Sequence, residues 1–234
     1  MNNRILKNIS SLVIATLIVV SCGNSSNNNE GQPQEIKNQI DEISFQEDDC
    51  PDEFIKTIEA YSFTELGLAC RKGDLNSAKN LIERGACKNR CMSDEIFEYD
   101  VLYTSVMFDK IDIVKYFINT EKDVNKVYDE NGMTLLTLAC MRDKSDISFH
   151  MSKLLLDAGA NVNGGGDMGF DYILYPLFEA IKNNNLRLVE LLIDNGADIT
   201  IVDKQDETIF TIIDGYGVNF EMKDYINSLR IEEE

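Results

Sequence analysis

The sequence contains no tryptophan, three prolines and one histidine among its 234 residues, and it has far fewer basic than acidic side chains. With His150 as the single imidazole, both a zinc site of about four clustered ligands and a histidine-based nucleophile pair are poorly supplied. Lysine and arginine number 22 against 41 acidic residues, which gives a formal net charge of −19. Such a charge argues against binding to nucleic acid or to anionic lipid. We therefore expect no enzyme, no metal, no cofactor and no small-molecule substrate.

Long apolar runs are also scarce. Arg4 and Lys7 precede an apolar stretch, Leu12–Val20, which is too short to cross a bilayer as a helix because that takes about 20 residues. A basic start, a short apolar run and a small residue at Ser21 are typical of a secretory signal peptide. We predict that residues 1–21 form such a peptide.

The run Val19-Val20-Ser21-Cys22 resembles the lipobox of bacterial lipoproteins. The resemblance implies cleavage before Cys22 and acyl chains such as palmitate on its sulfur and on the new amine. Several chains, at about 0.8 kcal/mol for each buried CH₂, make a stable membrane anchor. By similarity to lipoprotein sorting in enterobacteria, Gly23 favours the outer membrane, while the leaflet and the exposed face stay open. The alternative is that Cys22 is an ordinary first residue of an exported chain.

The segment after Cys22 has a composition that cannot build a core. Residues 23–34 contain no aliphatic or aromatic side chain, so we expect residues 22–48 to be a flexible, lipidated tether. Removal of residues 1–21 takes away two basic residues and no acidic one, which leaves 20 − 41 = −21 on the mature chain. This charge favours a basic protein as the partner, or it serves solubility alone.

A pattern recurs along the rest of the chain. Leu66–Cys70 is followed by similar segments at Leu136–Cys140 and Pro176–Ala180, and each precedes a second apolar segment that ends near a glycine. The aligned anchor positions are separated by 36, 34, 41 and 33 residues, and they are Thr64, Asp100, Thr134, Tyr175 and Thr208.

These segments resemble the ankyrin repeat, which has a period near 33 residues. The resemblance implies an all-α solenoid of about five helix-turn-helix units joined by hairpin loops, and a role in protein binding. We expect this domain over residues 64–234, with units starting near 64, 100, 134, 175 and 208, after an N-terminal capping segment over residues 49–63.

Local chemistry agrees with this reading. A threonine or aspartate at the anchor position can cap the helix that follows it, and Pro176 suits a first helical position. Gly85, Gly159 and Gly196 can end the second helices in the left-handed conformation. Since each unit alone exposes its apolar face, only stacking supplies a core.

Three segments depart from the repeat. We expect a capping helix before Thr64 that includes Phe54, Ile55 and Ile58, and a loop insertion within Asp143–His150 whose role the sequence does not indicate. The glycine-rich run 164–169 matches G-x-G-x-x-G formally, but it follows a helix stop and contains Asp167. We interpret it as a hairpin tip, because a dinucleotide site needs a preceding strand and a following helix.

Five cysteines follow Cys22, so at least one thiol in a monomer has no disulfide. Cys70 and Cys140 occupy the same small-residue slot two units apart, and we expect them to be buried thiols. Cys87 and Cys91 share one loop and can bridge each other, with Cys50 as a competing partner.

The ankyrin resemblance also implies a partner surface, because arrays of this family usually bind through hairpin tips and first helices. Around the start of the second unit these positions are unusually apolar, which favours an interaction site there. They are Ile96, Phe97, Tyr99, Met107 and Phe108. The alternative is that the loop Lys88–Tyr99 folds back and buries this group. The matching positions are Arg71, Lys72, Ile96, Phe97, Tyr99, Met107, Phe108, Met133, Met141, Arg142, Asp171, Tyr172, Leu174 and Tyr216.

The leading hypothesis is a non-catalytic, protein-binding ankyrin-repeat lipoprotein displayed outside the cytoplasm. An acidic, tethered binder suits an immunity or inhibitor protein for a basic toxin, although fold alone does not decide a biological role. The alternative is an envelope scaffolding lipoprotein that organises resident membrane proteins.

Overall fold

The computed structural model describes residues 53–230 except 95, 121–122, 130, 143–144 and 166–173. These residues belong to the second of the two units into which the chain divides, which spans residues 49–234. The expectations for the signal peptide, the lipobox, the tether and most of the glycine-rich run 164–169 lie outside the described residues. Within the described part, no helix combines the length and the apolar character needed to span a bilayer.

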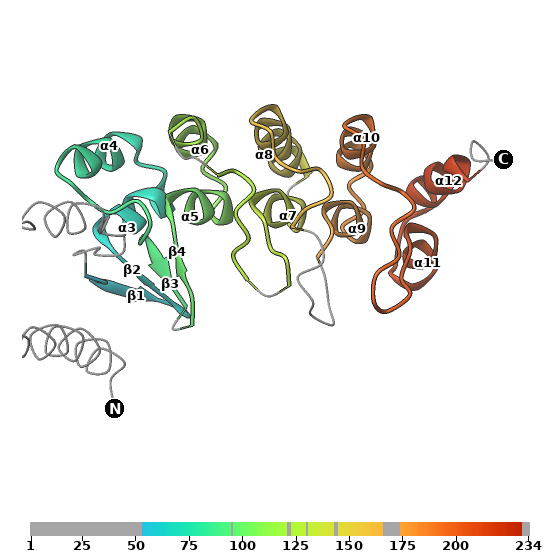
Figure 1. Cartoon of the computed structure of the whole chain (residues 1–234), viewed down its shortest axis with the longest axis horizontal. Coiled ribbons are helices and arrows are strands. Elements are labelled where there is room, and N and C mark those ends of the chain that lie inside the picture. The colour runs from blue at the N-terminus through green and yellow to red at the C-terminus, as the bar shows by residue number, and fades with distance from the viewer. Residues whose placement is uncertain are drawn as a thin grey trace, which may run out of the picture. The chain divides into compact units, whose positions relative to one another are not determined.

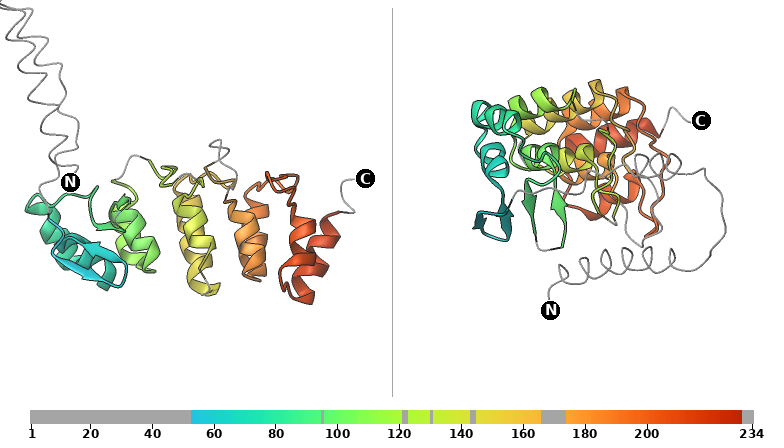
Figure 2. Two further views of the ribbon diagram at one scale, coloured as in Figure 1. Left: turned by 90° about the horizontal axis from the view of Figure 1, so that it is seen from below. Right: turned by 60° about the vertical axis from the view of Figure 1, so that its left-hand side comes forward.

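Ten helices in the described residues follow one another as antiparallel pairs, and Figures 1 and 2 show the pairs arranged in a row. Figure 1 also shows that the first helices of the pairs form one layer and the second helices form the other. The first helices are α3 (Glu65–Lys72), α5 (Val101–Met107), α7 (Leu135–Cys140), α9 (Pro176–Lys182) and α11 (Ile209–Gly215). The second helices are α4 (Leu75–Glu83), α6 (Ile111–Phe117), α8 (Ser145–Asp157), α10 (Leu186–Asp194) and α12 (Phe220–Leu229).

The core lies between the layers and between neighbouring pairs. Each first helix contacts the next one along the row, and α8 contacts both α6 and α10 in the second layer. The position six residues after the anchor is fully buried in four consecutive first helices, as Cys70, Val106, Cys140 and Ile181. Burying a side chain of this kind contributes about 1.5–3 kcal/mol for the larger aliphatic residues, so stacking supplies the stability that one pair lacks.

The anchor residues are the N-caps of the first helices. The Thr64 hydroxyl accepts from the Gly67 amide at 3.1 Å, and the Asp100 carboxylate accepts from the Tyr103 amide at 2.9 Å. Thr134 and Thr208 cap α7 and α11 in the same way. Tyr175 makes no such bond, and Pro176 follows it as the first residue of α9. The capping chemistry predicted from the sequence is confirmed at the threonine and aspartate anchors.

Gly85, Gly159 and Gly196 follow the second helices with φ angles of 90°, 91° and 85°. This left-handed conformation costs other residues about 1–2 kcal/mol, so these positions end α4, α8 and α10. The prediction for these glycines is confirmed.

A small antiparallel sheet stands beside the first pair, so the prediction of an all-α fold is wrong in this region. Its strands are β1 (Lys56–Ile58), β2 (Tyr61–Phe63), β3 (Met92–Ser93) and β4 (Glu98–Tyr99), in the order β1-β2-β3-β4. Phe63 pairs with Lys56 on one side and with Met92 on the other.

The capping helix predicted before Thr64 is therefore also wrong. Glu59 has a φ of 57° and turns the chain between β1 and β2, which a helix could not accommodate. Ile58 packs against the core and Phe63 is fully buried, whereas Ile55 is 57% exposed. The apolar residues of this segment therefore cover the first pair as a hairpin.

The insertion in the third unit extends a helix instead of forming only a loop. Helix α8 has 13 residues, compared with nine in α10, and it begins at Ser145, inside the predicted insertion. Ser148 is buried and its hydroxyl donates to the Arg142 carbonyl at 2.9 Å. His150 lies on this helix, exposed, with its Nδ1 2.7 Å from the Asp146 carbonyl. The extra residues expected within Asp143–His150 therefore lie at least partly in helix α8.

Candidate functional site

Strands β3 and β4 and the turn between them form the hairpin that joins the first unit to the second. This hairpin, here called the first hairpin, rests directly on α3. A Cβ atom built on Gly67 would lie 1.8 Å from the Cys91 carbonyl oxygen, so this contact exists only because residue 67 has no side chain. The same carbonyl accepts from the Thr64 amide at 3.1 Å. The base of the hairpin is thus fixed to the first turn of α3.

Asp94 organises the turn of this hairpin, here called the Asp94 turn, in which the structure describes Asp94, Ile96 and Phe97. Its carboxylate accepts from the Ile96 amide at 3.1 Å, from the Phe97 amide at 2.8 Å and from the Tyr99 hydroxyl at 2.6 Å. Burial acts to raise the pKa of Asp94, but the hydrogen bonds from Tyr99, Phe97 and Ile96 outweigh it and lower the pKa below 3.8. The sequence analysis missed this role of Asp94, although an aspartate that accepts from amides two and three residues later is a frequent turn former.

Behind the turn lies a continuous row of aromatic rings, here called the aromatic row. Phe97 contacts Tyr99 at 6.5 Å between ring centroids, Tyr99 stacks on Tyr103 at 4.2 Å, and Tyr103 contacts Tyr128 at 4.7 Å. Burial raises the pKa of both Tyr99 and Tyr103 well above the ordinary value, so both phenols stay protonated near neutral pH. The row connects the first hairpin to α5 and to the following loop.

Asp100 links two neighbouring units at the foot of this row. One carboxylate oxygen caps α5, while the other accepts from Lys126 Nζ and from the Tyr128 hydroxyl, both at 2.8 Å. The Asp100 side chain is 12% exposed, so these charge-assisted bonds are stronger than surface ion pairs. The first hairpin therefore sits on a braced support.

The tip of the Asp94 turn exposes two apolar side chains, here called the tip patch. Ile96 is 81% exposed and Phe97 is 37% exposed. Two other turns between units carry polar residues where they are described, Asn131 in one and Lys204–Asp206 in the other. The turn between the third and fourth units lies outside the described residues. Of the two alternatives for the loop Lys88–Tyr99, burial holds for Tyr99 and exposure holds for the tip patch.

A second cluster continues the surface along the ends of the first helices. The Arg71 guanidinium lies 5.6 Å from the Phe63 ring and 5.1 Å from the Phe108 ring, within cation–π range of both. Further along, Arg142 pairs with Asp109 at 3.4 Å. These basic residues are held in place by contacts between neighbouring units.

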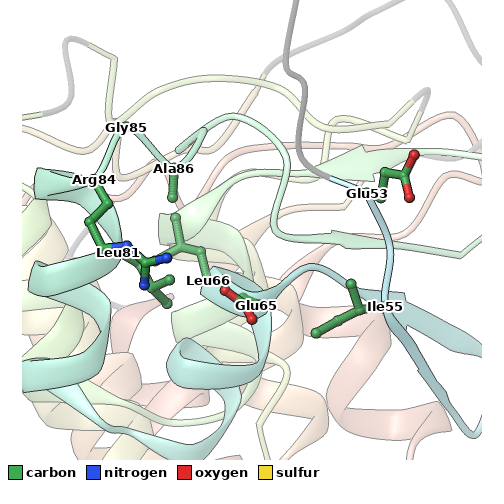
Figure 3. Close-up of a pocket in the computed structure, with 8 residues that line it drawn as sticks. All are labelled: Glu53, Ile55, Glu65, Leu66, Leu81, Arg84, Gly85 and Ala86. Carbon is green, nitrogen blue, oxygen red and sulfur yellow. The ribbon is translucent and has the colours of Figure 1, made fainter.

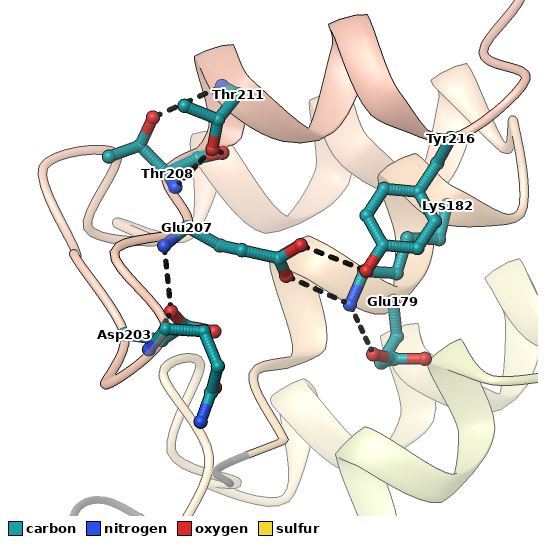
Figure 4. Close-up of polar contacts among 8 residues, drawn as sticks. Glu179, Lys182, Asp203, Glu207, Thr208, Thr211 and Tyr216 are labelled. Carbon is teal, nitrogen blue, oxygen red and sulfur yellow. Dashed lines mark hydrogen bonds and ion pairs between the residues drawn. The ribbon is translucent and has the colours of Figure 1, made fainter.

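Near the C-terminal end of the stack of helix pairs, Lys182 lies between two carboxylates. It is 3.6 Å from Glu179 and 3.5 Å from Glu207, and its ammonium faces the Tyr216 ring at 4.8 Å. The Tyr216 hydroxyl donates to Glu207 at 2.8 Å, as Figure 4 shows. Burial raises the pKa of Glu179, and Lys182 opposes that shift. The sequence pointed to Tyr216 but not to this network, because Tyr216 belongs to the fifth unit and its partners Glu207 and Lys182 belong to the fourth.

The residues predicted to bind a partner fall into four groups. Tyr99, Met133 and Leu174 are buried and offer little surface. Those that are half-buried are Arg71, Met107, Phe108, Met141 and Arg142. Those that are exposed are Lys72, Ile96, Phe97 and Tyr216. Asp171 and Tyr172 lie outside the described residues. The structure thus brings Ile96 and Phe97 together and places Tyr216 in the fifth unit, at the other end of the stack.

The cysteines correct one prediction and confirm another. Cys87 is disulfide-bonded, whereas Cys91 retains its thiol, which donates to the Lys88 carbonyl at 3.6 Å. The predicted Cys87–Cys91 bridge is therefore wrong, because Cys91 turns toward the core at the base of the hairpin. Cys50, the competing partner, lies outside the described residues. Cys70 and Cys140 are buried thiols as predicted, and burial raises the pKa of Cys140 to about 12.

A groove of about 370 Å³ lies at the end of the first pair, between α3 and the loop after α4. Figure 3 shows Leu66, Leu81 and Ala86 along it, with the charged ends of Glu65 and Arg84 nearby. In the described part of the chain, no group of three or more His, Cys, Asp or Glu side chains is arranged to hold a metal ion.

Comparisons with known proteins identify the repeats. The family described as ankyrin repeats (3 copies) matches residues 66–165 and 102–203, which together cover more than half of the chain. Ankyrin repeat and SOCS box protein 6 of Homo sapiens is 26% identical over 159 residues, which are 64% of this chain and 33% of that protein. Putative ankyrin repeat protein L371 of Acanthamoeba polyphaga mimivirus is 30% identical over 148 residues, 63% of this chain and 18% of that protein.

Palmitoyltransferase AKR1 of Lachancea kluyveri is 28% identical over 145 residues, which are 60% of this chain and 19% of that protein. The chain thus spans about a third or less of the length of these relatives. Ankyrin repeats generally serve as protein-interaction modules and are typically non-catalytic. The resemblance noted in the sequence is confirmed by the family match and by the helix pairs: this chain belongs to the ankyrin-repeat family.

Proposed function

We propose that this protein is a non-catalytic binding module, exported and lipid-anchored to a bacterial membrane through Cys22, which captures a partner protein at the tip patch. The single observation that carries the binding site is the exposure of Ile96 and Phe97, at 81% and 37%, on a turn held by the Asp94 carboxylate. Solvent-exposed apolar side chains on a rigid support are the usual anchors of a protein interface.

The support of the tip patch favours affinity. The Asp94 carboxylate fixes the turn, the aromatic row holds it from behind, and Gly67 lets its base lie directly on α3. A preorganised loop loses little conformational entropy when a partner binds. Phe97, which contacts Tyr99, therefore presents its ring without having to be ordered first.

The net charge supports a basic partner. The chain carries −19 in total, and electrostatic attraction mainly accelerates encounter and sets specificity, while a buried aromatic anchor supplies affinity. An acidic module tethered outside the cytoplasm fits an immunity or inhibitor role against a basic exported toxin. In that role the tip patch would occupy an apolar pocket of the toxin, and acidic residues around it would meet the toxin's basic surface.

Site-specific photocrosslinking in cells tests the binding site. A photoreactive residue at position 97 should capture a discrete partner, whereas the same residue at position 205 should not, because Gln205, like Phe97, lies three residues before a helix-capping anchor but belongs to a polar turn. The proposal further predicts that the captured protein is basic and that its binding weakens as salt rises. Equal capture at both positions, or capture at 205 alone, would contradict the assignment of the tip patch.

A separate experiment tests the anchor. Cells fed an alkyne analogue of palmitate should label the protein, and Cys22→Ser should abolish the label and release the protein from membranes, with Cys140→Ser as the matched control. Retention of residues 1–21 in the membrane-bound protein, without a fatty acid, would contradict the lipid anchor while leaving the tip patch untouched.

A further inference from the structure

Two buried thiols meet beneath the first hairpin. Cys70 lies in the last half of α3 and Cys91 directly precedes β3, and both side chains have no exposed surface. A Cβ built on Gly67 would lie 3.3 Å from the Cys91 Cα atom. Since Cys70 follows Gly67 by one helical turn on the same face, the chain brings the two cysteines together at this contact.

The two side chains also interact directly. Cys70 is hydrogen-bonded to the Cys91 side chain and to the Ser105 side chain. The Ser105 hydroxyl also donates to the Val101 carbonyl at 2.6 Å, which holds Ser105 beside Cys70. The Cys91 bond is the largest influence on Cys70 and, with the Ser105 bond, lowers its pKa against the opposing effect of burial.

We propose that Cys70 and Cys91 form a second site of covalent cross-linking, which an external disulfide converts from a dithiol to a disulfide. Neither the repeat pattern nor the proposed function assigns this site, and the inference does not depend on the partner. It concerns the base of the hairpin that carries the tip patch.

The chemistry balances with a disulfide reagent as the oxidant. The reagent reaches the buried pair when the first hairpin opens locally. One cysteine thiolate then attacks a sulfur of the reagent, which breaks the reagent's S–S bond and releases one thiol. The second cysteine thiolate then attacks the protein sulfur of this mixed disulfide and releases the second thiol. The protein loses two protons and two electrons and gains one S–S bond, while the reagent is reduced to two thiols.

Cys140 provides an internal comparison. It occupies the same slot as Cys70 two units later and is equally buried, but its sulfur faces the Ser152 hydroxyl at 3.7 Å. Burial raises its pKa to about 12, so little thiolate forms there. Of two cysteines in equivalent places, only Cys70 faces a second thiol, so we expect a cross-link there and none at Cys140.

Peptide mapping after oxidation tests the proposal. The purified full chain is incubated with oxidised glutathione, quenched in acid, unfolded with N-ethylmaleimide and digested without reductant. We expect a Cys70–Cys91 cross-linked peptide pair in the wild type and in Cys140→Ser, and no such pair in Cys91→Ser. We also expect the oxidised protein to melt several degrees higher than the reduced one, because the cross-link restricts the unfolded chain.

Several outcomes would overturn the proposal. Recovery of Cys70 and Cys91 as maleimide adducts, glutathione adducts that never resolve to the pair, or a bridge from either cysteine to Cys87 would each contradict it. Because the wild-type map decides the question by itself, a variant that fails to fold does not leave the proposal untested.

Discussion

The Asp94 turn and the turn at residues 203–207, here called the Asp203 turn, share one backbone device but present different surfaces. In both, an aspartate carboxylate accepts from amides two and then three or four residues later: Ile96 and Phe97 in the first, Gln205 and Glu207 in the second. The first turn exposes apolar side chains, whereas the second exposes polar ones. The scaffold and the recognition surface of this array therefore vary independently.

The surroundings of the two turns differ as well. Beside the Asp203 turn, Glu207 accepts from the Tyr216 hydroxyl and pairs with Lys182, so its polar groups bind one another. Beside the Asp94 turn, the aromatic row supports the hairpin from behind and leaves the tip patch facing outward. A partner gains more from the first surface, because burying exposed apolar area is favourable and separating an internal ion network is not.

The largest difference in stability between the first and the last helix pair is expected from substitutions at the third position of helices α3 and α11. Gly67→Ala places a methyl group against the Cys91 backbone and should lower the free energy of unfolding by at least about 3 kcal/mol. Thr211→Ala removes the capping box of α11, in the matching position of the last pair, and should cost only about 1 kcal/mol. Urea unfolding of both variants measures this, and equal losses would show that the first hairpin does not rest on α3.

For the ion pairs we expect the opposite: the larger loss of stability at the C-terminal end of the stack and the smaller one at the first hairpin. Lys182→Met leaves Glu179 and Glu207 together with side chains only 12% and 23% exposed, and should cost about 2 kcal/mol. Glu98→Gln, at the first hairpin, breaks a pair with Arg90 in which Glu98 is 52% exposed, and should cost less than about 1 kcal/mol. Thermal unfolding at low and high salt compares them. A larger loss for Glu98→Gln would contradict the proposed difference in burial.

Acid should affect the Asp94 turn through a defined group. The pKa of Asp94 is lower in the folded protein than its ordinary value of 3.8. Its carboxylate therefore stabilises the fold at pH values above 3.8, and this contribution is lost as the pH falls through the pKa of the folded state. Asp94→Asn should therefore cost about 1 kcal/mol at neutral pH, and the difference from wild type should shrink as the pH falls below 3.8. A constant difference across this range would show that the charge of Asp94 does not matter.

The smallest effect on stability is expected at the tip patch itself. Ile96→Ser removes a largely exposed side chain and should change the free energy of unfolding by less than about 0.5 kcal/mol, while Phe97→Ala, whose ring is 37% exposed, should cost no more than about 1 kcal/mol. Denaturant unfolding of the two variants checks this. A loss above about 2 kcal/mol would indicate that these side chains belong to the core of the hairpin and not to a binding surface.

The sequence was sufficient for features that depend on local chemistry. Thr64, Asp100, Thr134 and Thr208 cap helices because a short side-chain oxygen reaches an amide three residues later, and this holds whatever the neighbours are. The glycines after the second helices were found for a similar reason, since their left-handed conformation is a property of single residues.

Features that depend on distant contacts were not predictable. The segment around Ile58 suits a helix or a strand. In the structure β1 pairs with β2, and β2 pairs with β3, some 30 residues later, which selects the strand. A sequence cue was present in the β-branched and aromatic residues of Lys56–Ile58 and Tyr61–Phe63. Cys91 offered none, because its orientation toward Cys70 depends on the absence of a side chain at Gly67.

The central claim is that the first hairpin presents the binding surface and the Asp203 turn does not. The most direct measurement uses the partner after photocrosslinking has identified it and it has been purified. Its affinity is measured for the wild-type protein and for the variants Phe97→Ala and Gln205→Ala. The account predicts that Phe97→Ala weakens binding at least about tenfold, equivalent to about 1.4 kcal/mol, while Gln205→Ala changes it less than about twofold. Equal losses in the two variants, or a loss only in Gln205→Ala, would contradict it.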